Sequence, residues 1–237
     1  MELDLTKGGC VRVITLYSIP IIIGNVFQQC YQLVDSIIVG RNVSYQALAG
    51  LGASNGLVFF IIGFVLGITS GMGICMAQAF GKGDYDRLRR SLATSLVICA
   101  ATTLLLTLAG VVLCGPVLRW MGTPADVMPN SILYFRVLFL GIIGNLMYNI
   151  LQGVHQAIGD STHPLYYLII SSVTNIILDV LFVGVMGFSV GAAALATIIS
   201  QFLSSILSLT HLLRGPEEYR VRLKEIRIDK ELMKEVI

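Results

Sequence analysis

Six long apolar segments recur along the chain, roughly at residues 11–39, 47–79, 91–113, 130–153, 164–186 and 189–213. Each is long enough for a helix that crosses the hydrocarbon core of a bilayer, which takes about 20 residues. Short polar connections separate them, apart from an uncharged, tight connection at 184–191. The pattern predicts an all-α polytopic membrane protein, with a six-helix transmembrane bundle over residues 1–213.

The pattern changes abruptly after Leu213. Residues 214–237, "RGPEEYRVRLKEIRIDKELMKEVI", are charged, with apolar residues at helical spacing toward the end. Such a segment is typical of an amphipathic helix on the membrane surface. We therefore predict a cytoplasmic amphipathic linker at 214–237.

Composition and charge fit this prediction and add an orientation. Hydrophobic residues make up 55% of the chain, charged residues only 13%, and the mean hydropathy is +0.81, whereas a soluble domain has about 25% charged residues. With the N-terminus inside the cell, most of the 16 lysines and arginines fall in cytoplasmic loops, as the distribution of positive charge in membrane proteins requires. The exceptions are Arg41, Arg119 and Arg136, and Trp120 marks the outer interface. We expect both termini to be cytoplasmic.

Four of the predicted helices carry a stripe of polar side chains on one face, spaced at about 100° per residue. Amides and hydroxyls in such stripes commonly form hydrogen bonds between helices, but they also suit a wet cavity. The expected polar lining of that cavity is Gln28, Gln32, Asn145, Asn149, Gln152 and Gln201.

Two aspartates in the stripes, Asp35 and Asp179, need a functional explanation. An aspartate in a spanning helix costs about 2.5–3.5 kcal/mol of insertion free energy and usually marks an ion or proton pathway. Asp35 lies five residues before Gly40, and Asp179 lies five residues before Gly184, so the two carboxylates are expected at one depth. Asn175 lies one turn deeper on the same face as Asp179.

Thr197 of the sixth helix completes a set of hard oxygen ligands with Asp35, Asn175 and Asp179. Such a set suits Na⁺, and paired buried carboxylates equally suit a proton. The residues alone leave this choice open.

The sequence does not indicate an enzyme or a cofactor. We find no pairing of nucleophile and base, no phosphate-binding glycine loop and no histidine cluster with the spacing of metal ligands. His155, His163 and His211 are expected at cytoplasmic helix ends, in solvated polar roles rather than as ligands.

Several motifs, in order, resemble the bacterial multidrug and toxic compound extrusion (MATE) transporters. They are "IPIIIGNVFQQCYQLVDSIIVG" (19–40), "GITSGMGICMAQAFGKGD" (67–84), "QAIGDSTHP" (156–164) and "VGAAALATIISQ" (190–201). The resemblance implies a transporter in the bacterial inner membrane that exports cationic, amphipathic drugs or metabolites in antiport with Na⁺ or H⁺. It also implies a cation site at Asp35 with Tyr31, at Asn175 and Asp179, and at Thr197.

The resemblance covers only the first of the family's two six-helix lobes. The drug cavity of such transporters lies between lobes, so a second lobe is an expected partner. We expect this chain to be part of a transporter about twice as long, in preference to a half-size protein that pairs with a second copy.

Two alternatives remain at this stage. A flippase for lipids or polyprenol-linked sugars would need a cationic cavity for phosphate groups, yet the polar faces carry carboxylates and amides. In a non-transporting membrane scaffold, the polar stripes would serve only helix packing.

Overall fold

The computed structural model describes residues 10–42 and 45–215, and these residues are almost entirely helical. The predicted linker at 214–237 lies outside them from residue 216 onward. The helices are α1 (Cys10–Asn42), α2 (Tyr45–Gly81), α3 (Tyr85–Trp120), α4 (Met128–Leu140), α5 (Ile142–Ala157), α6 (Thr162–Asp179), the π-helix η1 (Val180–Val185) and α7 (Val190–Arg214).

Five of the spans are single helices long and apolar enough to cross a membrane, and α4 and α5 together make a sixth. Large apolar side chains cover the outer surface of the bundle, among them Ile22, Leu104 and Ile206. A surface of this kind is stable in lipid, because lipid tails are as apolar as these side chains. The all-α membrane fold is therefore confirmed, with five spans, or six when the bent pair α4 and α5 is counted as one.

The fourth span differs from the expected straight helix because it bends by 50° between α4 and α5. The break falls at Gly141, where a Cβ atom would lie only 2.3 Å from side-chain atoms of Ile198 on α7. Only glycine lets α7 approach the chain so closely here. Sequence hydropathy did not reveal the bend, because apolar residues continue on both sides of it.

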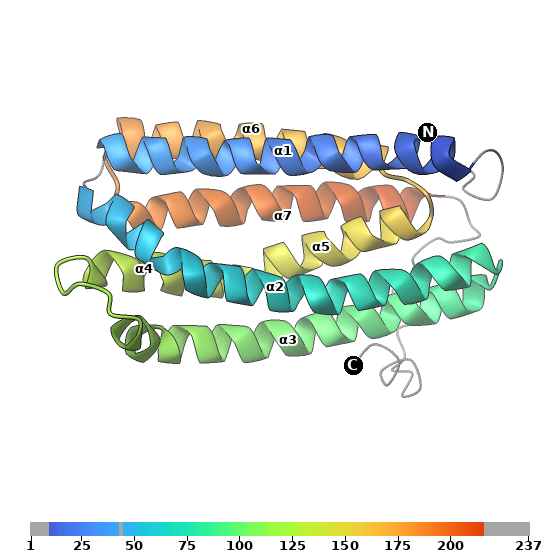
Figure 1. Cartoon of the computed structure of the whole chain (residues 1–237), viewed down its shortest axis with the longest axis horizontal. Helices are drawn as coiled ribbons and strands as arrows, with labels where there is room; N and C mark the ends of the chain where they lie inside the picture. Colours follow the sequence, from blue (N-terminus) through green and yellow to red (C-terminus); the bar gives the residue numbers. More distant parts are fainter. Residues whose placement is uncertain (1–9, 43–44, 216–237) are drawn as a thin grey trace.

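Figure 1 shows the helices as long, roughly parallel rods, with α1 and α6 side by side and α7 next to them. The first residue of α1 and the last residue of α7 lie at the same end of the bundle, as six crossings require. We call this end the histidine end, because α5 finishes there next to His155 and α6 begins there next to His163. The opposite end, where α1, α3 and η1 finish, is called the carboxylate end. Trp120 lies there and is 89% exposed.

Candidate functional site

At the carboxylate end, Asp35 of α1 and Asp179 of α6 face each other. Their carboxyl groups are close enough to interact directly, because α1 and α6 run side by side. Asp179 is 0% exposed, and Asp35 is partly buried. Three of the four carboxyl oxygens, Asp35 Oδ1 and both of Asp179, are buried without a hydrogen-bond partner among the described residues.

Asn175 and Thr197 extend this group of oxygens. The Asn175 amide Nδ2 donates to Thr197 Oγ1 at 3.5 Å, which is a long hydrogen bond. Thr197 Oγ1 itself donates to the Ala193 carbonyl at 3.1 Å, so its remaining lone pair can still accept. Asn175 Oδ1 is buried, again with no donor among the residues that the structure describes.

Two tyrosines complete the surroundings of the carboxylates. Tyr31, one turn before Asp35 on α1, interacts electrostatically with Asp35 and Asp179. Tyr134 of α4 interacts with the same two aspartates and with Tyr31. Sequence reasoning missed Tyr134, although a tyrosine within an apolar helix signals a hydroxyl that needs a polar partner.

A cavity of about 450 Å³ opens beside the carboxylates, between α1, α2, α4, α5 and α7. Asp35 lines this cavity, but Asp179 and Asn175 do not, so Asp35 lies between the cavity and the buried Asp179. The polar side chains at its wall include Gln28, Tyr31, Gln32, Asn145, Thr197 and Gln201.

Two of the residues expected in the polar lining lie elsewhere. Asn149 and Gln152 of α5 do not line this cavity. The Asn149 amide donates to the Asn145 carbonyl at 2.8 Å and to Asn145 Oδ1 at 3.2 Å. The helix also changes direction by 50° at Gly141, before it reaches these two residues.

The helix that carries Asp179 changes form directly after it. Residues Val180–Val185 form a π-helix, in which hydrogen bonds join residues five apart, such as the Met186 N–H and the Leu181 carbonyl at 2.9 Å. Short π-helical turns are rare and frequently occur at functional sites. The expected tight connection at 184–191 therefore begins inside a widened helix.

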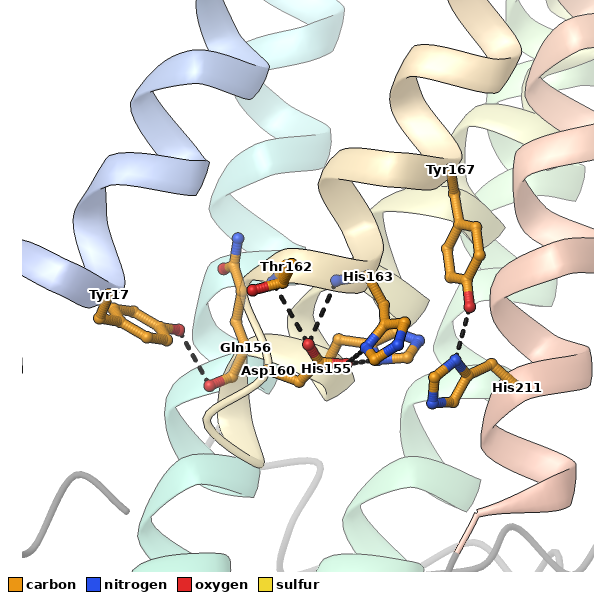
Figure 2. Close-up of polar contacts among 8 residues, drawn as sticks. All are labelled: Tyr17, His155, Gln156, Asp160, Thr162, His163, Tyr167 and His211. Atoms are coloured by element: carbon orange, nitrogen blue, oxygen red, sulfur yellow. Dashed lines mark hydrogen bonds and ion pairs between the residues drawn. The ribbon is translucent and has the colours of Figure 1, made fainter. Parts of the chain in front are cut away.

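The three histidines lie at helix ends, as expected, but they meet in one cluster. His155 is completely buried, and it approaches His163, His211 and Asp160 at the histidine end (Figure 2). The expectation of a solvated role is wrong for His155, because α5, α6 and α7 meet around it, whereas His163 and His211 are partly exposed. This cluster is far from the carboxylates, at the other end of α6.

Chemically, the carboxylate end is a set of buried oxygens, four of which have no hydrogen-bond donor among the described residues. Burying a charged or polar group without a partner costs several kcal/mol, so two adjacent carboxylates call for a bound cation or a proton. The oxygen atoms of Asp35, Asn175, Asp179 and Thr197 are ligands that a small hard cation prefers.

Comparison with known proteins identifies the family. The sequence profile of the MatE family matches residues 20–181. The probable multidrug resistance protein YoeA of Bacillus subtilis (strain 168) is 32% identical over 96% of this chain and 51% of its own length. YpnP, another probable multidrug resistance protein of that strain, is 28% identical over 89% of this chain and 47% of its own.

Solved structures give the same result. A multidrug resistance MATE family transporter of the MOP superfamily, in its outward-facing conformation, superposes with a TM-score of 0.89 at 25% identity, over 99% of this chain and 52% of that one. The chain thus spans about half the length of the relatives it matches. With six spans, a family profile over most of its length and this fold, the chain belongs to the MatE family of membrane transporters and represents one lobe of it.

Proposed function

We propose that the protein exports cationic, amphipathic compounds in exchange for Na⁺ or H⁺, and that Asp35 and Asp179 bind the coupling ion. The observation that carries this proposal is the pair of facing carboxyl groups with three buried oxygens that lack partners among the described residues. The chain belongs to a family of transporters, in which a buried carboxylate pair can bind the ion that is exchanged.

Asp179 is the central ligand in this proposal, because it is fully buried and neither of its oxygens is satisfied. Asp35 lines the cavity, so it connects the ion to the space where a substrate binds. Asn175 and Thr197 supply neutral oxygens, and Tyr31 with Tyr134 encloses the site.

The cavity favours a cationic substrate. Its wall contains amides, tyrosines, apolar side chains and Asp35, with no lysine, arginine or histidine from the part of the chain that the structure describes. Aromatic faces and a carboxylate attract organic cations. A phosphate-bearing lipid would need basic groups at this wall, so the cavity argues against the flippase alternative.

Transport requires a second lobe beside this one. The chain corresponds to about half of its relatives, and the substrate would pass between two lobes. The second lobe comes either from the same longer chain or from a second copy in the same orientation. Basic residues such as Lys82, Arg90 and Arg214 gather at the histidine end, so this end and both termini face the cytoplasm of the bacterial cell in our proposal.

Asp179→Asn tests the coupling role most directly. In everted membrane vesicles that contain the full-length protein, where export appears as uptake into the lumen, uptake of a fluorescent cationic dye should fall to the background level. Asp35→Asn should do the same. The matched control is Asp86→Asn, which makes the same chemical change at a side chain that is 88% exposed and should leave dye uptake unchanged.

The coupling ion is identified by comparing which gradient, Na⁺ or pH, drives dye movement. Dye movement is measured once with a Na⁺ gradient at equal pH on both sides, and once with a pH gradient in Na⁺-free buffer. Whichever gradient drives uptake should lose its effect in Asp179→Asn. Dye transport that persists unchanged in both aspartate variants, at equal protein levels, would overturn the proposal.

A further inference from the structure

The geometry points to a second ligand site, independent of the transport site: a Zn²⁺-type ion bound at the histidine end by Asp160, His163 and His211. One candidate ligand atom from each of these residues lies within 4.8 Å of the other two. They come from the loop before α6, the first turn of α6 and the last turn of α7. All three histidines of the sequence belong to this cluster, which Figure 2 shows.

Asp160 is the centre of the cluster. Its Oδ2 accepts from His155 Nδ1 at 3.0 Å and from His163 Nδ1 at 2.8 Å. Its Oδ1 accepts from the backbone N–H groups of Thr162 and His163, both at 3.2 Å. Burial alone would raise the pKa of Asp160, but the hydrogen bonds from His155 and His163 outweigh it and hold this pKa well below its ordinary value.

The ligand atoms of Asp160 and His163 are already close to the separation that zinc needs, and His211 offers a third ligand atom within 4.8 Å of both. Tetrahedral Zn²⁺ with bonds of about 2.0–2.1 Å keeps its ligands about 3.3 Å apart. The 2.8 Å between Asp160 Oδ2 and His163 Nδ1 need only widen slightly for the ion to replace the proton that these atoms share. The rings of His163 and His211 have centroids 4.1 Å apart, so His211 can close in by side-chain rotation.

Two further residues hold the ligands in place. The buried His155 donates from Nδ1 to Asp160, and its Nε2 is a buried nitrogen without a hydrogen-bond partner within the described part of the chain. The hydroxyl of Tyr167 lies 2.6 Å from His211 Nδ1. Supporting contacts of this kind orient the ligands of metal sites. We assign His155 and Tyr167 as positioning residues, and a water molecule as the fourth ligand.

The chemistry of the donors selects the class of ion. Two imidazoles and one carboxylate suit Zn²⁺ and neighbouring transition metals, whereas Mg²⁺ and Ca²⁺ prefer sites made of oxygen only. A bound ion would join the start of α6 to the end of α7.

The first test is a titration of the purified full-length protein in detergent with Zn²⁺ alone, followed by calorimetry and by equilibrium dialysis. We expect one ion bound per chain, with the ring proton of His163 moving from Nδ1 to Nε2 as the ion takes its place. Mg²⁺ in large excess should not compete. His163→Ala and His211→Ala should each weaken binding by about 100-fold or more, since loss of a merely supporting group already costs 10–100-fold.

Matched controls separate the cluster from other ligands. Cys30 is an exposed free cysteine, and Cys30→Ser should leave zinc binding unchanged. Tyr167→Phe should weaken binding by about 10-fold or more, whereas Tyr166→Phe, next to it and exposed, should not. His155→Ala should weaken binding without changing the number of ions bound.

A spectrum of the wild-type protein keeps the proposal testable if a variant does not fold. Co²⁺ in place of Zn²⁺ should give the visible absorption of a tetrahedral site with nitrogen and oxygen ligands. A thiolate charge-transfer band, a stoichiometry that survives in both His163→Ala and His211→Ala, or binding that is no tighter than that of Mg²⁺ would each overturn the proposal.

Discussion

Asp160 and Asp179 lie at opposite ends of α6, roughly 28 Å apart at 1.5 Å per residue, and both are buried. Four N–H groups donate to the Asp160 carboxylate. By contrast, neither oxygen of Asp179 has a hydrogen-bond partner among the described residues. The fold thus supplies the hydrogen-bond donors for Asp160, whereas Asp179 depends on a cation or proton from outside the protein.

The difference separates a structural carboxylate from an exchangeable site. A buried charge with complete hydrogen bonding holds neighbouring elements in one arrangement. In the proposed function, the carboxylate without donors gains and loses a cation or a proton, as an ion-coupled transporter needs. Replacing Asp160 should therefore lower stability, whereas replacing Asp179 should abolish transport and change stability little.

The largest effect is expected for Asp160→Ala. It removes the acceptor of two imidazole and two backbone N–H groups, and breaking a buried charge network costs about 3–5 kcal/mol. Thermal unfolding in detergent with a chelator present would show this as a lower midpoint, read by a thiol-reactive dye that reaches the buried Cys99 and Cys114 on unfolding. The control Asp86→Ala should unfold like the wild type, and equal midpoints for both variants would contradict the structural role of Asp160.

Gly141→Ala comes next and acts at the carboxylate end. The added methyl group would lie 2.3 Å from Ile198, and overpacking costs about 1–3 kcal/mol. It should also displace Thr197, the neighbour of Ile198, and reduce dye efflux while zinc binding stays unchanged. Gly115→Ala is the control, because its Cβ would meet Ile132 at an ordinary 3.8 Å. Equal loss of efflux and zinc binding in Gly141→Ala would mean that the two ends are not separate.

Asp179→Asn should change stability little, and in the direction opposite to Asp160→Ala. Because the carboxylate has no donors to lose, a neutral amide should leave the free energy of unfolding unchanged or raise it by up to about 1 kcal/mol. Any stabilisation that Na⁺ gives the wild type should disappear, since a ligand stabilises only the state that binds it. Unfolding midpoints with and without Na⁺ measure both effects. A large drop in the midpoint without Na⁺ would show that Asp179 is structural.

The smallest effect is expected for Tyr167→Phe under metal-free conditions. It removes one hydrogen bond, to His211, and should cost about 1 kcal/mol or less. The midpoint should therefore fall far less than in Asp160→Ala. A comparable fall would locate the structural centre of the histidine end at Tyr167 rather than at Asp160.

Much of the fold follows from the sequence because bilayer thickness and backbone hydrogen bonding restrict a spanning segment to a long apolar helix. Helical rise alone also placed Asp35 and Asp179 at one depth, and the structure brings their carboxyl groups together. Their role as an ion site remains a prediction.

Contacts between segments far apart in the sequence were not predictable in this way. The bend at Gly141 depends on the close approach of Ile198, which lies 57 residues later. The histidine cluster depends on three helices meeting, and no spacing of His155, His163 and His211 along the chain indicates it. Only "GDSTHP" offered a local signal, since an aspartate before a helix commonly accepts from its first N–H groups.

Trp120 gives this protein a convenient optical property. It is the single tryptophan of the sequence, and it lies at the end of α3 with 89% of its surface exposed. All tryptophan fluorescence of the chain therefore comes from one point at the carboxylate end. Lipids that carry a quencher at known depths would report how far this end sits from the bilayer centre, with no label attached and no residue replaced.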